Sequence, residues 1–452
     1  MANLSYGLDF GTTNSSLAVV DKDGQLQKVF LDPNSSNPSI MRSIIYANSN
    51  GEFVYGKHAI DAYGTDVKEG KGRVKKTMYT GRFITVTGDA DIHGVNPDEL
   101  VEELIEFDEF QGGRMLQSLK SVLAKESITG INIFGTTYLL EEIIGGFLKA
   151  MKDAGDKELG QTVDSVVLGR PVRYVGDNEK LAVERMEKAA RIAGFQNIVF
   201  EYEPIGAAYD FGRKSEKPQT VLIFDFGGGT LDISVVTFPE KKVLSNVGMP
   251  LGGDLFNAKI FSKTLAPFFG SNTTYGPNKM FMPAYLYVSL KDWYKATLLK
   301  NEKFDEQMEH FRFMNSDEKR IDALWSLVNN NLSFSLYDEI DRVKRNLSDK
   351  NQEEFMFLAP QIDIKTDISK LEFEELISGE VAEINKLLED ALKIAGVKAK
   401  DIDAVSTTGG SSLIPLVRSL LIHKFGKEKI IPNDAFTSVA GGLAVRAKEM
   451  FI

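Results

Sequence analysis

The sequence contains no cysteine and only four histidines among its 452 residues. Disulfide bonds, cysteine nucleophiles and iron–sulfur clusters are therefore excluded. The histidines stand far apart, without the close spacing of a zinc site, at positions His58, His93, His310 and His423. No apolar run approaches the roughly 18–20 residues that cross a bilayer, and the chain opens without a basic and apolar leader. We expect a cytoplasmic protein that has no membrane contact.

Basic residues are fewer than acidic residues. Lys and Arg number 53 against 64 Asp and Glu, so the formal net charge is −11. This balance argues against nucleic acid as a partner, because phosphate backbones are bound through clustered Lys and Arg. One basic stretch, residues 67–82, is followed by an acidic stretch, residues 97–110. We interpret the two as solvated faces that could be neighbours.

A duplicated segment organises the chain. The stretch GLDFGTTNSSLAVVD (7–21) returns as IFDFGGGTLDISVVT (223–237). Each copy reads as an apolar strand, an Asp-Phe-Gly turn and a second strand, which is a hairpin signal. Two copies near the starts of two halves predict two related lobes rather than a solenoid, which would need several short repeats.

Helical periodicity and apolar runs alternate in both halves, which predicts an α/β protein with a mixed or parallel sheet. We expect helices over 137–155 (ending at Gly155), 177–195 (closed by Gly194), 373–395, 412–425 and 436–450, and strands over 164–172, 197–204 and 402–410. The stretch 270–335 is less regular. We interpret it as a loop-rich insertion with a small core of its own, and its aromatic residues leave a partner surface as the alternative.

The hairpin turns carry the first functional hypothesis. Backbone N–H groups in a tight glycine turn form an anion-binding nest, and Thr12 and Thr13 add hydroxyl donors. Asp9, directly before this turn, would repel a phosphate unless a divalent cation lay between them. Mg²⁺ commonly sits between carboxylates and phosphates and keeps several waters. Asp9 and Asp225 would then each hold a metal-bound water.

Two further glycine segments extend this hypothesis. Gly227–Thr230 form a second phosphate loop in the second copy of the hairpin. A glycine pair, Gly409 and Gly410, joins an apolar strand to a helix, where the helix N-terminus favours an anion or polar ligand. A plain strand-to-helix turn is the alternative for this pair.

These three loops, in this order, resemble the superfamily of actin, sugar kinases and 70-kDa heat-shock proteins. Other segments resemble the heat-shock branch in particular: YEPIGAAYDFG (202–212), GMPLGGDLFN (248–257), DRVKRNLSD (341–349) and SVAGGLAVRA (438–447). The resemblance covers almost the whole chain. It is closest to short bacterial members that stop after the nucleotide-binding domain, and it implies that the hydrophobic linker and peptide-binding domain are missing.

The resemblance implies a two-lobed, actin-like ATPase fold built from duplicated ribonuclease-H-like domains with inserted subdomains. Lobe I would comprise residues 1–215, with an insertion over about 36–135, and lobe II residues 216–435, with an insertion over about 258–372. The last helix, within residues 436–452, would pack back on lobe I.

The resemblance also assigns roles to residues. The catalytic set would be Lys120, Glu203, Asp225 and Asp232, with Asp9 and Asp225 holding the metal through water. The nucleotide would contact Gly11, Thr12, Thr13, Asn14, Gly227, Gly228, Gly229, Thr230, Gly252, Gly253, Asp341, Lys344, Arg345, Ser348, Gly409, Gly410 and Ser411. Lys75 and Lys76 rival Lys120 as the lysine beside the γ-phosphate, and a surface lysine on an amphipathic helix is the other interpretation of Lys120.

The function implied is that of a weak ATPase of the heat-shock 70 type, acting as a chaperone-like protein with ATP or ADP and Mg²⁺, and with K⁺ as a further candidate ion. We expect a monomer whose lobe movement signals to a separate protein partner or exchange factor. Two alternatives use the same site: an actin-like filament protein, and a small-molecule kinase acting on a sugar.

Two departures from the family pattern predict weak nucleotide binding. The usual glutamate of the adenosine helix is Asp341 here, and Leu413 stands where the family has an arginine that stacks on adenine. Loss of that stacking weakens binding by about 0.5–2 kcal/mol. We therefore expect Mg-ATP affinity below that usual in the family, measured by calorimetric titration, with Leu413→Arg binding more tightly. Nanomolar affinity in the unmodified protein would contradict this.

Overall fold

We describe the protein from a computed structural model, which describes residues 4–33, 35, 37–48, 50–69, 73–87, 98–110, 113–213, 218–291, 296, 299–314, 317–432 and 437–451. Of residues 67–69, 73–87 and 98–110 it describes the backbone alone. The chain divides into two compact units. Unit 1 contains residues 1–63, 114–256 and 374–452, and unit 2 contains residues 64–113 and 257–373.

The first sheet of unit 1 has six strands. Its main path runs β13-β12-β1-β2-β3, and β4 pairs with β2. β1 is antiparallel to β2 and parallel to β12, which is parallel to β13. The strands are β1 (Ser5–Phe10), β2 (Asn14–Val20), β3 (Leu26–Lys28), β4 (Met41–Arg42), β12 (Ser165–Arg170) and β13 (Asn197–Tyr202).

The second sheet of unit 1 repeats this pattern with five strands, in the order β16-β15-β14-β21-β22. β14 is antiparallel to β15 and parallel to β21, which is parallel to β22. The strands are β14 (Gln219–Phe226), β15 (Leu231–Phe238), β16 (Lys242–Met249), β21 (Ala404–Thr408) and β22 (Ile430–Pro432). The two hairpins read from the duplicated sequence are therefore confirmed, and each begins a meander that two parallel strands extend.

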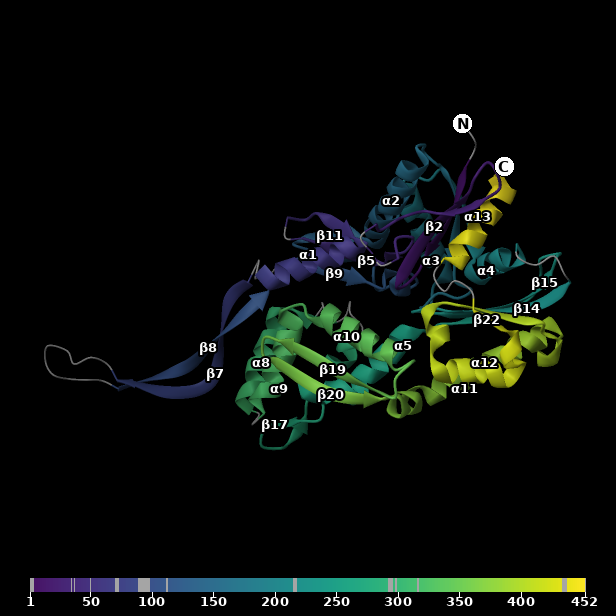
Figure 1. The fold of residues 1–452 in the computed structure, drawn as a ribbon. Helices are drawn as coiled ribbons and strands as arrows, with labels where there is room; N and C mark the ends of the chain where they lie inside the picture. Colours follow the sequence, from purple (N-terminus) through teal and green to yellow (C-terminus); the bar gives the residue numbers. More distant parts are fainter. Residues whose placement is uncertain are drawn as a thin grey trace. The chain divides into compact units, whose positions relative to one another are not determined.

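One hydrophobic core joins the two sheets through α4 (Glu203–Gly212) and α13 (Ser438–Phe451). It combines buried side chains of both helices with strand residues such as Val167 and Ile223. The helices cross where they have no side chains, because a Cβ on Gly442 would lie 1.6 Å from the carbonyl oxygen of Gly206. α13 also packs on β1 and β2, as Figure 1 shows.

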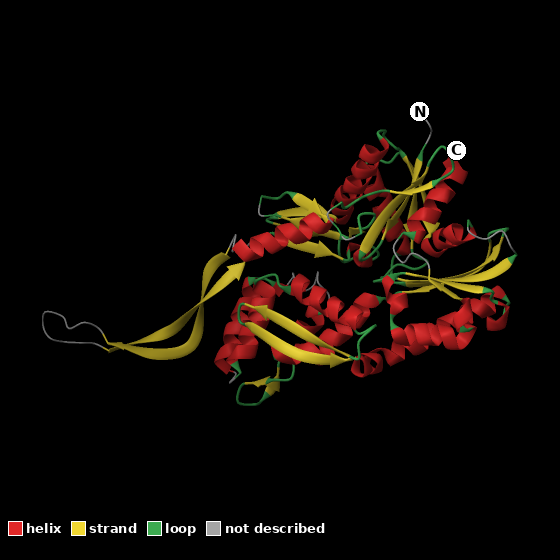
Figure 2. Ribbon diagram, viewed as in Figure 1, coloured by secondary structure: helices red, strands yellow, loops and turns green. Residues whose placement is uncertain are grey.

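The remaining elements of unit 1 are helices on the sheets and short hairpins (Figure 2). α2 packs against α3, and β6-β5-β9 and β10-β11 form small antiparallel sheets. Their bounds are α1 (Gly56–Glu69), α2 (Leu140–Leu159), α3 (Glu179–Ile192), α11 (Lys370–Ala395), α12 (Pro415–Phe425), β5 (Ile44–Ala47), β6 (Phe53–Tyr55), β9 (Arg114–Gln117), β10 (Gly130–Ile133) and β11 (Thr136–Leu139). α1 and α11 begin or end beyond the boundary of this unit.

The predicted end of α2 at Gly155 is wrong. The helix continues to Leu159 and is closed by Gly160 in the left-handed conformation. Gly155 is needed for packing, since a Cβ there would lie 2.6 Å from the hydroxyl oxygen of Tyr6. By contrast, α3 does end before Gly194, which has a φ of +98°. A glycine inside an amphipathic pattern can thus mark close packing rather than a helix end.

Unit 2 contains a long two-stranded ribbon and a helical body. β7 (Arg73–Thr87) pairs antiparallel with β8 (Asp98–Phe110), and the register places Lys75 opposite Asp108. The basic and acidic stretches are therefore neighbours, as the charge pattern suggested. The other elements are α6 (Ala284–Leu290), α8 (Glu302–Met314), α9 (Glu318–Asn329), α10 (Ser333–Asn346), β17 (Thr274–Tyr275), β18 (Met280–Phe281), β19 (Gln352–Ala359) and β20 (Ile362–Ser369).

The expectation of a loop-rich insertion over 270–335 is wrong, because α6, α8 and α9 occupy much of this stretch. It does have buried side chains. Trp325 is 1% exposed and donates its indole N–H to Asp305 at 2.9 Å, and Asn329 donates to the same carboxylate oxygen at 3.1 Å. These bonds hold α9 to α8. The predicted lobe boundaries at residues 215 and 435 stay a prediction.

No helix within the described residues is long and apolar enough to cross a membrane.

The close crossing of α4 and α13 gives a test of the core. Gly442→Ala places a methyl group against backbone, so we expect the free energy of unfolding to fall by about 1–3 kcal/mol despite the better helix propensity of alanine. The control is Gly379→Ala in α11, where a Cβ would meet nothing within 4 Å. It should stabilise by about 0.5–1 kcal/mol. Urea denaturation measures both, and equal effects would contradict this account.

Candidate functional site

The first loop, Gly11–Asn14, joins β1 to β2 and is fixed by Ser43. The Ser43 hydroxyl donates to the Gly11 carbonyl at 2.7 Å, and its backbone N–H donates to the Thr13 carbonyl at 2.8 Å. Gly11 has no room for a side chain, because a Cβ would lie 2.1 Å from the Asn14 carbonyl oxygen. The loop is therefore a tight, supported turn, as an anion-binding nest requires.

The second loop, Gly227–Thr230, joins β14 to β15 and lies against the first. A Cβ on Gly228 would lie 2.4 Å from Thr13 Oγ1, and one on Gly229 would lie 2.7 Å from Thr12 Oγ1. Only glycine allows this approach. The threonine hydroxyls of one hairpin thus meet the glycine backbone of the other, and both loops can act on one ligand.

Two further predicted segments meet the second loop. Gly252 is packed against it, since a Cβ there would lie 2.2 Å from the Gly228 carbonyl oxygen, and Gly253 N–H donates to the Gly227 carbonyl at 3.1 Å. Gly253 begins α5 (Gly253–Ile260). From the segment after β21, Ser411 Oγ donates to the same Gly227 carbonyl at 2.7 Å. Gly410 lies one position before Ser411 in a short 3₁₀ turn.

Acidic side chains gather beside these loops. Asp225 and Asp232 are directly opposite each other in the β14–β15 pairing, where like charges destabilise a sheet. Asp232 is held in place, because its Oδ1 accepts the Val172 backbone N–H at 2.8 Å. Glu203, the first residue of α4, forms a buried ion pair with Lys120 at 2.5 Å. The surface-lysine interpretation of Lys120 is therefore wrong.

The charges of this cluster act on one another. Burial, followed by the charge of Glu203, raises the pKa of Asp9 to about 7, and the same two causes raise that of Asp232 to about 7. For Asp225, burial and then Glu203 and Asp232 raise the pKa well above its usual value. Burial alone would lower the pKa of Lys120, but the nearby Glu203 and Asp9 raise it. Four carboxyl groups thus share one ammonium group.

Four carboxyl groups beside a single ammonium group leave net negative charge, which a divalent cation could balance. Within the residues that the structure describes, no three His, Asp or Glu side chains are placed to ligate one metal together. A cation here would keep water in its shell, which Mg²⁺ commonly does. That Asp9 and Asp225 hold those waters stays a prediction.

The comparisons with known proteins agree with this geometry. A family model described as "Hsp70 protein" matches residues 110–275 and 295–449. The chain belongs to the Hsp70 family. The predicted membership is confirmed, and with it the actin-like, two-lobed ATPase fold of the family's nucleotide-binding domain.

Individual relatives of the Hsp70 family match at lower identity. The chain is 28% identical to the chaperone protein DnaK of Mycoplasmopsis synoviae (strain 53) over 445 residues, covering 97% of this chain and 57% of that protein. It is 28% identical to the chloroplastic heat shock 70 kDa protein 7 of Arabidopsis thaliana, covering 69% of this chain and 37% of the relative. The chain thus spans about half the length, or less, of these curated relatives.

The predicted adenosine-contacting residues of this Hsp70 chain lie in unit 2. On α10, Asp341 accepts ion pairs from Lys344 Nζ at 2.9 Å and from Arg345 Nε at 3.1 Å. Ser348 follows the end of this helix. Their role stays a prediction. The side chains of Lys75 and Lys76 lie outside the described residues, and Leu413 in unit 1 is 51% exposed.

The sequence reasoning missed Asp254 and Ser118. Asp254 N–H donates to the Gly228 carbonyl at 2.8 Å, and its Oδ2 accepts the Ser118 hydroxyl at 3.0 Å. Asp254 directly follows the predicted pair Gly252 and Gly253, and Ser118 lies two residues before Lys120. Both residues lie next to predicted site residues in the sequence, but their contact with each other is seen only in the fold.

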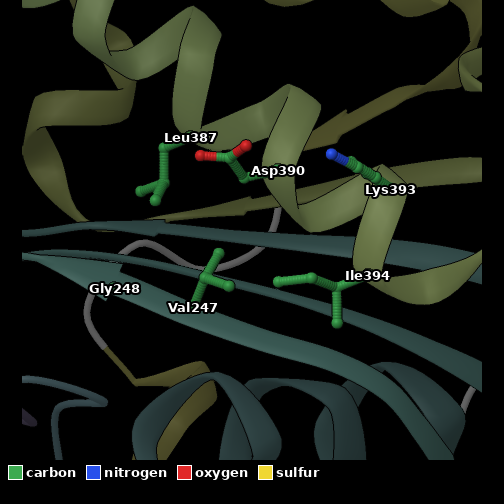
Figure 3. A pocket seen from close by; sticks show the side chains of 6 residues that line it. All are labelled: Val247, Gly248, Leu387, Asp390, Lys393 and Ile394. Carbon is green, nitrogen blue, oxygen red and sulfur yellow. The ribbon is translucent and has the colours of Figure 1, made fainter.

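A separate hollow of about 630 Å³ lies between β16 and α11 (Figure 3). Its lining mixes aliphatic side chains with one acid and one base: Val247, Gly248, Leu387, Asp390, Lys393 and Ile394. None of the predicted site residues lines it. Gly248 also lies beside the carboxylate cluster, since a Cβ there would lie 2.4 Å from Asp232 Oδ1.

The raised carboxyl pKa values predict how stability depends on pH. The pKa of Asp9 and Asp232 is about 7 when folded and about 3.9 when unfolded. The folded state therefore binds more protons between these values, and stability falls as pH rises from about 4 to 7. We expect a loss of up to about 4 kcal/mol for each of the two carboxyl groups, measured by urea denaturation without Mg²⁺ or nucleotide.

Asp232→Asn is the matched variant, because an amide oxygen can still accept the Val172 N–H. Its free energy of unfolding should fall less steeply over the same pH range. Identical pH dependence in both proteins would show that Asp232 does not contribute.

Proposed function

We propose that this chain binds Mg-ATP and hydrolyses it slowly to ADP and phosphate. The observation that carries the proposal is the contact between the two glycine loops beside four carboxyl groups and Lys120. Loop N–H groups and threonine hydroxyls would hold the phosphates, and the acidic cluster would hold the cation. Membership of the Hsp70 family favours this function over a filament protein or a sugar kinase.

Each residue of the site would have a separate role in hydrolysis. Phosphoryl transfer to water needs positioning and charge stabilisation more than covalent chemistry. Bound Mg²⁺ would neutralise phosphate charge and supply oriented waters. Asp232 and Glu203 are suited to orient the attacking water, since both are buried acceptors. Lys120 would stabilise the charge that develops on the transferring phosphoryl group.

We further propose a chaperone-like role in the cytoplasm. The relatives named above are a chaperone and a heat-shock protein, and this role would be carried out with a separate protein partner or exchange factor. ATP contacts to loops of both sheets would favour one arrangement of the lobes over another. We expect a monomer that needs neither nucleic acid nor membrane, with K⁺ as a candidate second ion.

Phosphate release from Mg-ATP tests the ATPase. Lys120→Met keeps the aliphatic stem and removes the charge, so turnover should fall by about 10²–10³-fold. Asp225→Asn should also reduce turnover and should weaken its dependence on Mg²⁺.

Lys152→Met is the matched control. Lys152 is also buried and pairs with a carboxylate, that of Asp156, at 2.5 Å, but it lies on α2 away from the loops. Its removal should lower stability and leave turnover intact. No turnover in the unmodified protein, with nucleotide bound in a titration, would refute hydrolysis and leave nucleotide binding alone.

A further inference from the structure

Arg170 lies at the end of β12, where the register pairs it with Tyr202, the last residue of β13. Tyr202 directly precedes Glu203, the first residue of α4. Tyr202 makes no side-chain cap hydrogen bond to this helix. Tyr202 is therefore the residue from which the chain enters α4 and Glu203.

The guanidinium of Arg170 lies near two aromatic rings. Its central carbon is 5.0 Å from the ring centroid of Tyr202 and 5.9 Å from that of Tyr174. Both distances lie within the range of cation–π attraction, about 6 Å. We call Arg170, Tyr174 and Tyr202 the arginine bracket.

Glu179 fixes the bracket from the start of α3. Its Oε2 pairs with Arg170 Nη2 at 3.2 Å, and its Oε1 accepts the Tyr174 backbone N–H at 2.6 Å. The Arg170 side chain is 21% exposed and that of Glu179 is 40% exposed. An ion pair this exposed contributes little stability by itself, so its main effect is to orient the guanidinium.

Tyr174 connects the bracket to the site. It is 2% exposed, and burial is the main cause of its raised pKa. The charge of Lys120 lowers that pKa and the charge of Glu203 raises it, so both charges act at the phenol. The bracket is thus joined to the Lys120–Glu203 ion pair through Tyr202, which directly precedes Glu203, and the charges of that pair act at Tyr174.

We propose that Arg170 is a positioning residue that fixes Glu203, and through it Lys120, by holding Tyr202 and Tyr174. This inference rests on the proposed ATPase function. Arg170 itself touches no reacting group. Its loss would change the direction of the ion pair and would leave the phosphate loops as they are, so the chemical step suffers more than binding.

The first test separates kcat from KM. Arg170→Met removes the charge and the planar group while keeping an unbranched side chain, and we expect kcat to fall by about tenfold with KM little changed. Arg170→Lys keeps the charge without the planar group and should recover part of kcat. Arg191→Met is the control: Arg191 pairs with Glu187 on α3 at 2.7 Å, with both side chains about half exposed, and it should behave as the unmodified protein.

The second test does not need hydrolysis. The ¹⁵N NMR signal of the Lys120 ammonium group, assigned by its absence in Lys120→Met, reports the ion pair directly. Arg170→Met should shift or broaden this signal in the nucleotide-free protein, and Arg191→Met should not. A shifted signal without any ATPase activity in the unmodified protein would support positioning and refute the proposed function.

The proposal is overturned if Arg170→Met lowers the melting temperature but leaves both kcat and the Lys120 signal unchanged, because Arg170 would then be only structural. If Arg170→Met does not fold, Arg170→Lys and Tyr202→Leu take its place. Removal of the Tyr202 ring should reduce kcat and move the Lys120 signal, and an unchanged signal in both would equally overturn the proposal.

Discussion

The excess of negative charge in a buried place is the constraint on which the rest of the site depends. Asp225 and Asp232 face each other across one strand pair, and Glu203 and Asp9 act on the same region. One ammonium group, that of Lys120, balances part of this charge. A sequence selected for stability alone would avoid such a cluster. The divalent cation of the proposed function would supply the positive charge that this cluster lacks.

The surrounding backbone is built to bring this cluster and the loops together. A Cβ on Gly228 or Gly229 would overlap a threonine hydroxyl of the first loop, so the two hairpins approach more closely than side chains would allow. The crossing of Gly206 and Gly442 does the same for α4 and α13. In both places, two backbone segments come close together because one of them has glycine, and therefore no side chain, at the point of contact.

Much of this could be predicted from the sequence because it is encoded locally. The hairpins, the glycine loops and the family follow from short motifs that carry their own chemistry. Three features could not be predicted this way. Gly155 looked like a helix end but is a packing glycine under Tyr6. The helices of residues 270–335 lie among turn-forming residues that suggested loops, and they make buried contacts such as that of Trp325 with Asp305. The partner of Lys120 is 83 positions away, beyond the reach of any local pattern.

Helix α4 links the chemistry to the core. It begins with Glu203 at the site, crosses α13 at Gly206, and carries Tyr209, whose ring lies 4.2 Å from Lys241 Nζ. Lys241 lies in the turn between β15 and β16 of the second sheet, while Glu203 follows β13 of the first. One short helix thus contacts both sheets. Because Glu203 is its first residue, a change in the direction of α4 also moves Glu203. A residue that fixes the start of this helix therefore acts on the ion pair at the site.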